Sequence, residues 1–358
     1  MQIRSKAEAQ QRADRIEAFR AELDTIEREQ VIALDPGQRA VVTRYHEQLL
    51  HRLAAAFDID ATSKEKQLSL GMRITSFLGA LGLAASVFFF YFQYWGGLAT
   101  KIQVLILVTM PLGGLLLTLA AVWLEKSGYF AKLFGLVSLV CFVLNLSMLG
   151  RIFNLAPTPQ AFLLWAGLAF LLAYAADARL LLAMGILSCA AYLSAQAATW
   201  NGCYWISFGE RPEHFLPAAA LFFLIPCIPH PRYPGFAALY RVFALLLFFL
   251  PVLVLSNWGE SSYFELPRER IEALYQIAGF VVSAAAIALG IRMGWPEVVN
   301  TGNVFFTLFL YTKFYDWWWD WMPKYQFFLI IGLTAIVMLL ILKWMRRFSI
   351  QRQGEVAA

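Results

Sequence analysis

The polar side chains with the most regular spacing lie in one apolar stretch near the C-terminus. A glutamate is followed at intervals of three, three, four and four residues by two asparagines, a threonine and a tyrosine: Glu297, Asn300, Asn303, Thr307 and Tyr311. On a helix these residues share one face. This polar stripe could line a path for a neutral polar solute. Alternatively, it could join neighbouring helices by hydrogen bonds of about 0.6 kcal/mol each, and we favour this second interpretation.

A dense aromatic segment follows the polar stripe. Residues 313–321 contain four tryptophans interleaved with charged side chains: Lys313, Asp316, Trp317, Trp318, Trp319, Asp320 and Trp321. One hypothesis is an outward platform on which a sugar or lipid headgroup stacks, with the two aspartates as catalytic groups. The other is an interfacial belt, because tryptophan rings are stable where the apolar core meets hydrated headgroups. We favour the belt.

Motifs that would define a catalytic or metal site are missing from the sequence. It contains no HExxH, GxSxG, Walker loop or Asp-rich metal motif. His46 and His51 are five residues apart, whereas paired ligands on a helix need a spacing of three or four, so we interpret both as solvated histidines. We therefore predict no catalytic residues, no metal and no cofactor, and whether the protein is an enzyme stays open, with a non-enzymatic role favoured.

The elements that carry these residues are predicted from composition. The chain has 358 residues, of which 60% are hydrophobic and only 15% charged, which is too apolar for a soluble globular protein. A bilayer core needs about 20 helical residues to cross it. Ten apolar segments approach that length, at residues 74–97, 102–124, 131–150, 160–176, 180–199, 215–230, 237–257, 271–291, 297–312 and 325–344. The predicted fold is an all-α, polytopic transmembrane bundle of about ten spans.

The charge distribution predicts the orientation of this bundle. Residues 1–73 carry twelve basic and twelve acidic side chains, so the net charge of +5 belongs to the rest of the chain. With the N-terminus inside, thirteen basic residues flank the cytoplasmic ends and seven the outer ends, as the positive-inside rule requires. We therefore predict a bacterial inner-membrane protein with both termini cytoplasmic. No basic patch suited to nucleic acid is present.

The first 66 residues predict a cytosolic helical hairpin. Apolar residues recur at helical spacing over 7–34, and Asp35 and Pro36 are typical of an N-cap and first turn. The second helix extends to about residue 57, with an apolar stripe at Val42, Tyr45, Leu49, Leu53 and Ala56. The pair is too small to bury a large core alone. Residues 7–57 are therefore a candidate surface for a protein partner or for self-association. The predicted domains are residues 1–66, the bundle at 67–347 and a short cytosolic tail at 348–358.

Prolines inside the apolar segments predict local breaks in helical hydrogen bonding. Pro111, Pro226 and Pro251 each lie within a predicted span. A proline removes a backbone donor, so a partner must satisfy the carbonyl that it frees. Broken helices occur at transporter sites and also in ordinary bundles.

Several apolar stretches resemble a known family of bacterial membrane proteins. They are residues 68–82, the segment 150–154 leading to 162–165, residues 303–313 and residues 327–347. These resemble the predicted membrane proteins of domain of unknown function 2157. In that family glutamine and tyrosine are expected where this chain has Arg151 and Phe153. The resemblance implies a helical N-terminal stretch followed by membrane spans, and it implies no particular activity.

Three functions follow as hypotheses. The first is a membrane assembly or scaffold role in which the N-terminal hairpin docks a partner. The second is a transporter or flippase for a neutral or amphiphilic solute, which the lack of charges at the centres of the spans disfavours. The third is an enzyme acting on outer-leaflet lipid or glycan.

Overall fold

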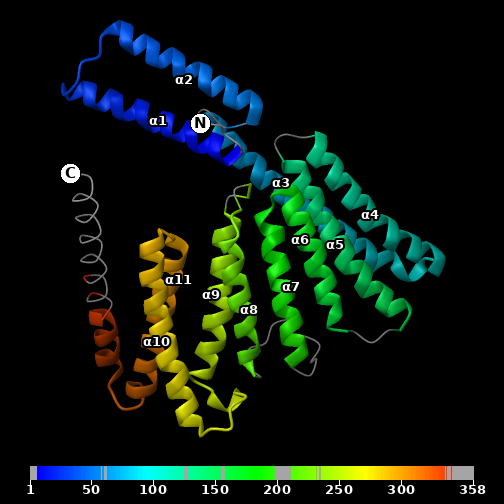
Figure 1. The fold of residues 1–358 in the computed structure, drawn as a ribbon. Helices are drawn as coiled ribbons and strands as arrows, with labels where there is room; N and C mark the ends of the chain where they lie inside the picture. Colours follow the sequence, from blue (N-terminus) through cyan, green and yellow to red (C-terminus); the bar gives the residue numbers. More distant parts are fainter. Residues whose placement is uncertain are drawn as a thin grey trace. The chain divides into compact units, whose positions relative to one another are not determined.

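The computed structural model describes most of the chain. The described residues are 6–57, 59, 63–124, 128–154, 158–197, 211–230, 232–233, 235–334, 336 and 340. All regular structure in these residues is helical, and they contain no strand. The α-helices before residue 320 are α1 (Lys6–Arg28), α2 (Pro36–Phe57), α3 (Ser63–Tyr94), α4 (Thr100–Leu124), α5 (Tyr129–Ile152), α6 (Gln160–Ala176), α7 (Arg179–Ala197), α8 (Phe215–Leu224), α9 (Phe236–Leu255), α10 (Arg268–Met293) and α11 (Pro296–Trp318) (Figure 1). A further helical stretch begins at residue 324 and is described to residue 334.

The all-α fold with several membrane spans is confirmed. Within the described residues, six helical segments can cross a membrane by length and composition: Ile74–Tyr91, Thr100–Leu124, Tyr129–Gly150, Arg179–Gln196, Phe236–Leu255 and Arg268–Met293. Two shorter apolar stretches are Gln160–Ala176 and Pro212–Cys227. The total of ten spans stays a prediction. The tail at 348–358 lies outside the described residues, and the predicted boundary at residue 66 falls within α3.

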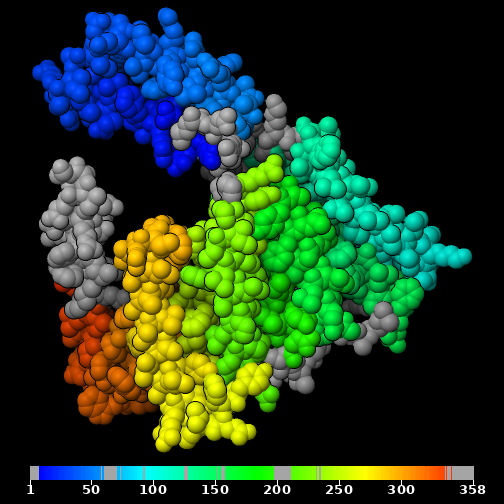
Figure 2. All heavy atoms as spheres, viewed as in Figure 1, coloured from blue at the N-terminus to red at the C-terminus, as the bar shows by residue number. Residues whose placement is uncertain are grey.

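The chain divides into two compact units. Unit 1 comprises Met1–Glu210 and His214–Leu247, and unit 2 comprises Arg211–Glu213 and Phe248–Ala358. Within unit 1, α1 and α2 lie side by side (Figures 1 and 2). The close pairs α4 with α5 and α6 with α7 supply much of the buried core of this unit.

Close approach of α4 and α5 depends on small residues beside a proline. Pro111 lies inside α4, and a Cβ on Gly114 would lie 3.0 Å from the Cα of Ser138 on α5. The proline removes the donor for the carbonyl four residues earlier, that of Leu107. The Asn145 side-chain amide on α5 donates a hydrogen bond to this carbonyl. The carbonyl that Pro111 leaves without a backbone donor therefore has a hydrogen-bond partner, as the sequence predicted.

Unit 2 is organised around the antiparallel pair α10 and α11. Gly294, with a φ of +68°, ends α10, and Pro296 occupies the first turn of α11. The two helices then pack closely, since a Cβ on Gly302 would lie 2.9 Å from Ile287 Cγ1. Phe249 of α9 stacks on Phe305 of α11 with ring centroids 4.7 Å apart. These contacts fix the face that α11 turns toward its neighbours.

Candidate functional site

The polar stripe of α11 lies opposite the face that packs in unit 2. The packed face is formed by Val298, Gly302, Phe305 and Phe309, which are all buried. Helical geometry of 100° per residue places the predicted stripe on the other side of the helix. Asn300 is exposed, and Glu297, Asn303, Thr307 and Tyr311 are half-buried. On α11 these residues therefore lie on the side of the helix that is turned away from the contacts with α9 and α10.

Two members of the polar stripe show how its polar atoms are used. The Thr307 hydroxyl donates to the Asn303 carbonyl within the same helix, at 2.8 Å. The Asn303 Oδ1 atom is buried and accepts no hydrogen bond among the described residues. The use of this stripe as a solute path stays a prediction.

The aromatic segment forms successive stacks along the end of α11. Trp318 stacks on Phe314 at 4.7 Å, and Trp319 stacks on Tyr315 at 5.0 Å. Lys324 lies over the Trp319 ring, 3.7 Å from its centroid, and also donates to the Trp319 carbonyl. These i, i+4 pairs stabilise the helix end, as an interfacial belt would.

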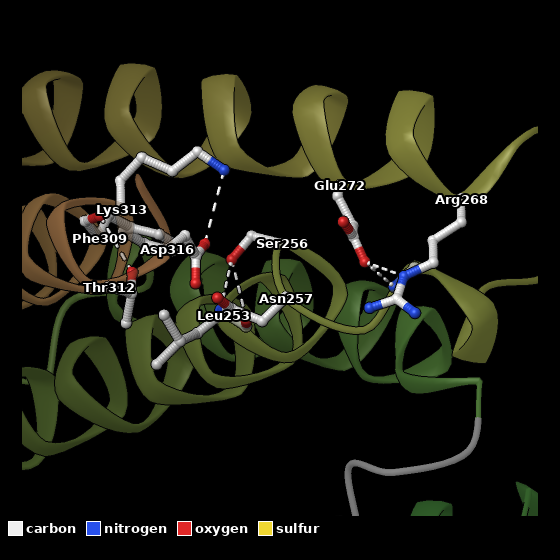
Figure 3. Close-up of polar contacts among 10 residues, drawn as sticks. Leu253, Ser256, Asn257, Arg268, Glu272, Phe309, Thr312, Lys313 and Asp316 are labelled. Atoms are coloured by element: carbon white, nitrogen blue, oxygen red, sulfur yellow. Dashed lines mark hydrogen bonds and ion pairs between the residues drawn. The ribbon is translucent and has the colours of Figure 1, made fainter. Parts of the chain in front are cut away.

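The charged groups of the aromatic segment are partly paired. Lys313 Nζ lies 3.6 Å from Asp316 Oδ2 (Figure 3) and 5.7 Å from the Trp317 ring centroid. Trp317 and Trp321 remain exposed, while Asp320 lies in the turn that follows α11. Asp316 is thus held in an ion pair with a neighbouring lysine one helical turn away. A catalytic role for Asp316 and Asp320 stays untested.

A polar cluster in unit 2 joins Arg211–Glu213 to the connection between α9 and α10. The sequence pattern did not predict this cluster. Glu213 Oε1 accepts hydrogen bonds from the Ser262 hydroxyl, from the Tyr263 backbone N–H at 3.1 Å and from the Tyr275 hydroxyl at 3.3 Å. The other carboxylate oxygen, Oε2, is buried without a hydrogen-bond partner in the described residues. Arg211 lies over the Tyr263 ring at 4.9 Å. This cluster fixes the connection between the two helices.

A second set of charges closes the same connection. Arg268 donates to Glu272 at 2.7 Å (Figure 3) and pairs with Glu260 at 2.9 Å. Glu272 also accepts from the Gly259 backbone N–H at 3.2 Å. At the end of α9, the Asn257 side chain donates to the Leu253 carbonyl at 2.8 Å (Figure 3). Each group is used to hold the chain, which indicates a structural role.

Unit 1 contains a hydrogen-bonded chain of one histidine and two tyrosines. His230 Nδ1 lies 2.5 Å from the Ile228 carbonyl, which can only accept, so Nδ1 carries the proton. In this tautomer His230 Nε2 is the hydrogen-bond acceptor. The Tyr174 hydroxyl donates to His230 Nε2 at 3.3 Å and accepts a hydrogen bond from the Tyr240 hydroxyl at 3.1 Å. This network was not predicted, because its members are 56 and 66 residues apart in the chain.

The hairpin α1–α2 is closed at its two ends. At the turn, Arg39 pairs with Asp24 at 2.6 Å and with Glu27 at 2.8 Å. Asp35 Oδ2 accepts from the Gly37 backbone N–H at 3.1 Å, which confirms Asp35 as the N-cap of α2. At the other end a small apolar core contains the buried residues Ala9, Ala13, Leu53 and Ile59.

Between its closed ends the hairpin leaves large apolar side chains exposed. Val41 is 69% exposed and Tyr45, one turn later, is 57% exposed. Phe19 of α1 is half-exposed and meets the His46 ring edge-on, with centroids 5.6 Å apart. We call Phe19, Val41 and Tyr45 the hairpin patch. Tyr45, a member of the predicted apolar stripe of α2, is thus exposed.

His46 also differs from the solvated histidine that was expected. Its Nδ1 atom is buried without a hydrogen-bond partner in the described residues. Burial, followed by the nearby positive charges of Arg20 and Arg12, lowers its pKa below the usual 6.5. The neutral imidazole is therefore favoured in the folded hairpin. Among the described residues no group of three His, Cys, Asp or Glu side chains is placed to hold a metal ion.

These features define a multi-pass α-helical membrane protein with a polar helical N-terminal segment. Residues 44–182 match the family described as predicted membrane protein, domain of unknown function 2157 (DUF2157). The match confirms the resemblance seen in the sequence, over the second helix of the hairpin and the helices as far as the start of α7. No curated protein and no solved structure matches the chain.

Proposed function

We propose that this protein is a scaffold of the bacterial inner membrane whose N-terminal hairpin docks a protein partner on the cytoplasmic side. The proposal includes ten spans with both chain ends inside. It is supported by ten apolar segments in the sequence and by six helical segments, among the residues that the structure describes, that are long enough to cross. Reporter fusions after residues 99, 157 and 265 should give an extracytoplasmic signal, and fusions at the two ends a cytoplasmic one.

The hairpin patch is the observation that carries the scaffold role. A closed helical pair would be expected to turn its large apolar side chains inward, yet Val41 and Tyr45 lie on the outer surface of α2. Because these residues are one helical turn apart and Phe19 lies beside His46, they form one contiguous surface. Contiguous exposed apolar groups on a soluble element mark interaction sites.

The geometry favours a helical protein segment as the occupant. The hairpin patch presents Val41 and Tyr45 at a spacing of four on α2, and an amphipathic helix can pack against such a surface with residues at spacings of three and four. The ends are already occupied by the Arg39 ion pairs and the small core around Leu53. The partner is therefore expected to contact the middle of the hairpin.

Paired substitutions test this surface. Val41→Lys places a charge in the patch, while Val31→Lys makes the same change at a residue that is 70% exposed in the turn, outside the patch. After cross-linking in intact cells and affinity purification of the full chain, Val41→Lys should lose a protein that the wild type and Val31→Lys retain. Deletion of residues 1–57 should remove the same protein while the spans stay in the membrane.

Three results would contradict the proposal. One is an identical set of cross-linked proteins for the wild type, Val41→Lys and the deletion. Another is a cross-link only between two copies of this chain, which would make the patch a self-association surface. A hairpin that labels with membrane lipid alone would assign the patch to the bilayer surface instead.

A further inference from the structure

The His230 network of unit 1 joins the connection between α8 and α9, residues 225–235, to a neighbouring helix. His230 lies on this connection, whereas Tyr174 belongs to α6 and Tyr240 to α9. The Tyr174 and Tyr240 ring centroids lie 6.2 Å and 6.3 Å from the His230 ring centroid. Tyr240 is only 3% exposed, and His230 and Tyr174 are half-buried. The network therefore reaches from the connection into the packed interior of unit 1.

With a neutral imidazole, every proton of the network has an acceptor. His230 Nδ1–H donates to the Ile228 carbonyl, the Tyr174 hydroxyl donates to His230 Nε2, and the Tyr240 hydroxyl donates to Tyr174. The order of donors is fixed because the Ile228 carbonyl can only accept. The neutral side chain thus holds the connection against α6.

A proton on His230 Nε2 removes the acceptor on which this order depends. Both imidazolium nitrogens are donors, so Tyr174 would have to accept from His230 instead of donating to it. The Tyr174 and Tyr240 hydroxyls share one hydrogen bond in either direction, so one of the two O–H groups loses its acceptor among the described residues. A buried donor without a partner is costly. The protonated network is therefore unstable in this arrangement.

The charged groups around the connection do not compensate a positive charge on His230. Arg232 is exposed on the connection itself, and Arg179 of α7 lies against the same connection. Asp177, which follows α6, interacts with Lys132 and Arg179. The helix α8 contains no ionisable side chain. Within the described residues no carboxylate forms an ion pair with His230, whose polar contacts are to a carbonyl and a tyrosine.

We propose that the α8–α9 connection is a pH-operated latch, in which neutral His230 holds the connection on α6 through Tyr174 and protonated His230 releases it. The latch is closed at neutral and alkaline pH, and it opens as the pH falls through the range in which histidine gains its proton. It uses no residue of the hairpin patch, so its test is independent of partner docking.

Hydrogen exchange measures release of the connection. The Tyr233 N–H donates to the His230 carbonyl at 3.1 Å and the Phe236 N–H to the Tyr233 carbonyl at 3.3 Å, so these amides are protected while the connection is closed. Exchange of the full-length protein in nanodiscs is followed by mass spectrometry at pH 7.5 and pH 5.0, and the intrinsic pH dependence of amide exchange is divided out. Peptides covering residues 225–239 should exchange about tenfold faster at pH 5.0, because one buried hydrogen bond is lost.

Two results of this measurement would overturn the latch. One is equal corrected exchange of residues 225–239 at both pH values. The other is the same acceleration in peptides of α5, which would show general loosening of unit 1.

Histidine variants identify the group that titrates. His230→Gln stays neutral at both pH values and keeps an acceptor oxygen, so the pH difference should disappear. His214→Gln removes the histidine that precedes α8 and should retain the difference. Retention of the difference in His230→Gln, or its loss in His214→Gln, would assign the titration to another group and overturn the proposal.

Tyrosine variants test the hydrogen bond that forms the latch. Tyr174→Phe removes the link to His230, so residues 225–239 should exchange fast at both pH values. The matched variant Tyr233→Phe removes a hydroxyl outside the network and keeps the ring that contacts Tyr174 at 5.0 Å, so it should behave as the wild type. Equal exchange in Tyr174→Phe and Tyr233→Phe would overturn the role of the hydrogen bond.

Discussion

The hydrogen bond from Asn145 to the Leu107 carbonyl offers a quantitative test of the packing of unit 1. Pro111 removes the backbone donor that would normally satisfy this carbonyl. Asn145, which is only 8% exposed, supplies its Nδ2 amide instead. If this account is correct, the asparagine matters because the proline is there, and the two residues should be energetically coupled.

The magnitude follows from the groups left unpaired. Asn145→Leu leaves the Leu107 carbonyl without its donor, and a buried unpaired group costs about 1–3 kcal/mol. The substitution also removes the Asn145 Oδ1 atom, which is itself buried without a partner, so we expect a net loss near the lower limit, ~1 kcal/mol. Pro111→Ala restores a backbone N–H. In the double variant the carbonyl regains a partner, so the loss should disappear.

The assay is a double-mutant cycle on the free energy of unfolding. Wild type, Asn145→Leu, Pro111→Ala and the double variant are unfolded from mixed micelles by SDS and followed by tryptophan fluorescence. We expect a coupling of about 1 kcal/mol, within the range of intramembrane hydrogen bonds. A control cycle that pairs Asn145→Leu with Pro251→Ala, a proline of another helix, should show none. Coupling within ~0.3 kcal/mol of zero for Pro111 and Asn145 would refute the reasoning.

Three further outcomes are expected. Since its folded pKa is lowered, His46 stabilises the hairpin above its unfolded pKa of about 6.5, and this contribution is lost as the pH falls through the folded pKa. Amide exchange in α1 and α2 should therefore be faster at pH 5 than at pH 7.5, and this difference should disappear in His46→Gln but remain in His51→Gln. Equal exchange of the wild type at both pH values would contradict the prediction. Gly302→Ala should lower stability by about 1–3 kcal/mol through overpacking, whereas Gly167→Ala, with open space around its Cβ, should not; similar melting temperatures for the two variants would count against the observed packing of α10 and α11. Glu213→Leu should loosen the α9–α10 connection and raise its susceptibility to proteolysis, because three donors lose their acceptor, while Glu213→Gln retains an acceptor oxygen; equal protection in both would argue against the cluster.

The positions of helices could be predicted because they depend on local signals. Apolar runs of sufficient length identify the spans, and the cap at Asp35 and the break at Pro111 follow from backbone chemistry within one or two turns. The sequence could also predict that Pro111 needs a partner. It could not name Asn145, which lies 38 residues from Leu107, because the pairing depends on how α4 and α5 pack.

The functional contacts were less predictable for the same reason. Glu213 meets Ser262 and Tyr275 across 49 and 62 residues without any periodic signal. Tyr45 occupies a position compatible with the apolar stripe of α2, yet it is exposed, since the ion pairs of Arg39 and the small core at the opposite end set how the hairpin closes. Periodicity shows which residues share a face, while tertiary contacts decide which face is covered.

The scaffold proposal is tested most directly by a photo-reactive amino acid placed at residue 45 of the full-length protein in living cells, with residue 31 as the matched exposed position. Irradiation should join residue 45, and not residue 31, to one discrete protein. Absence of any protein adduct at residue 45, or the same adducts from both positions, would contradict partner docking by the hairpin.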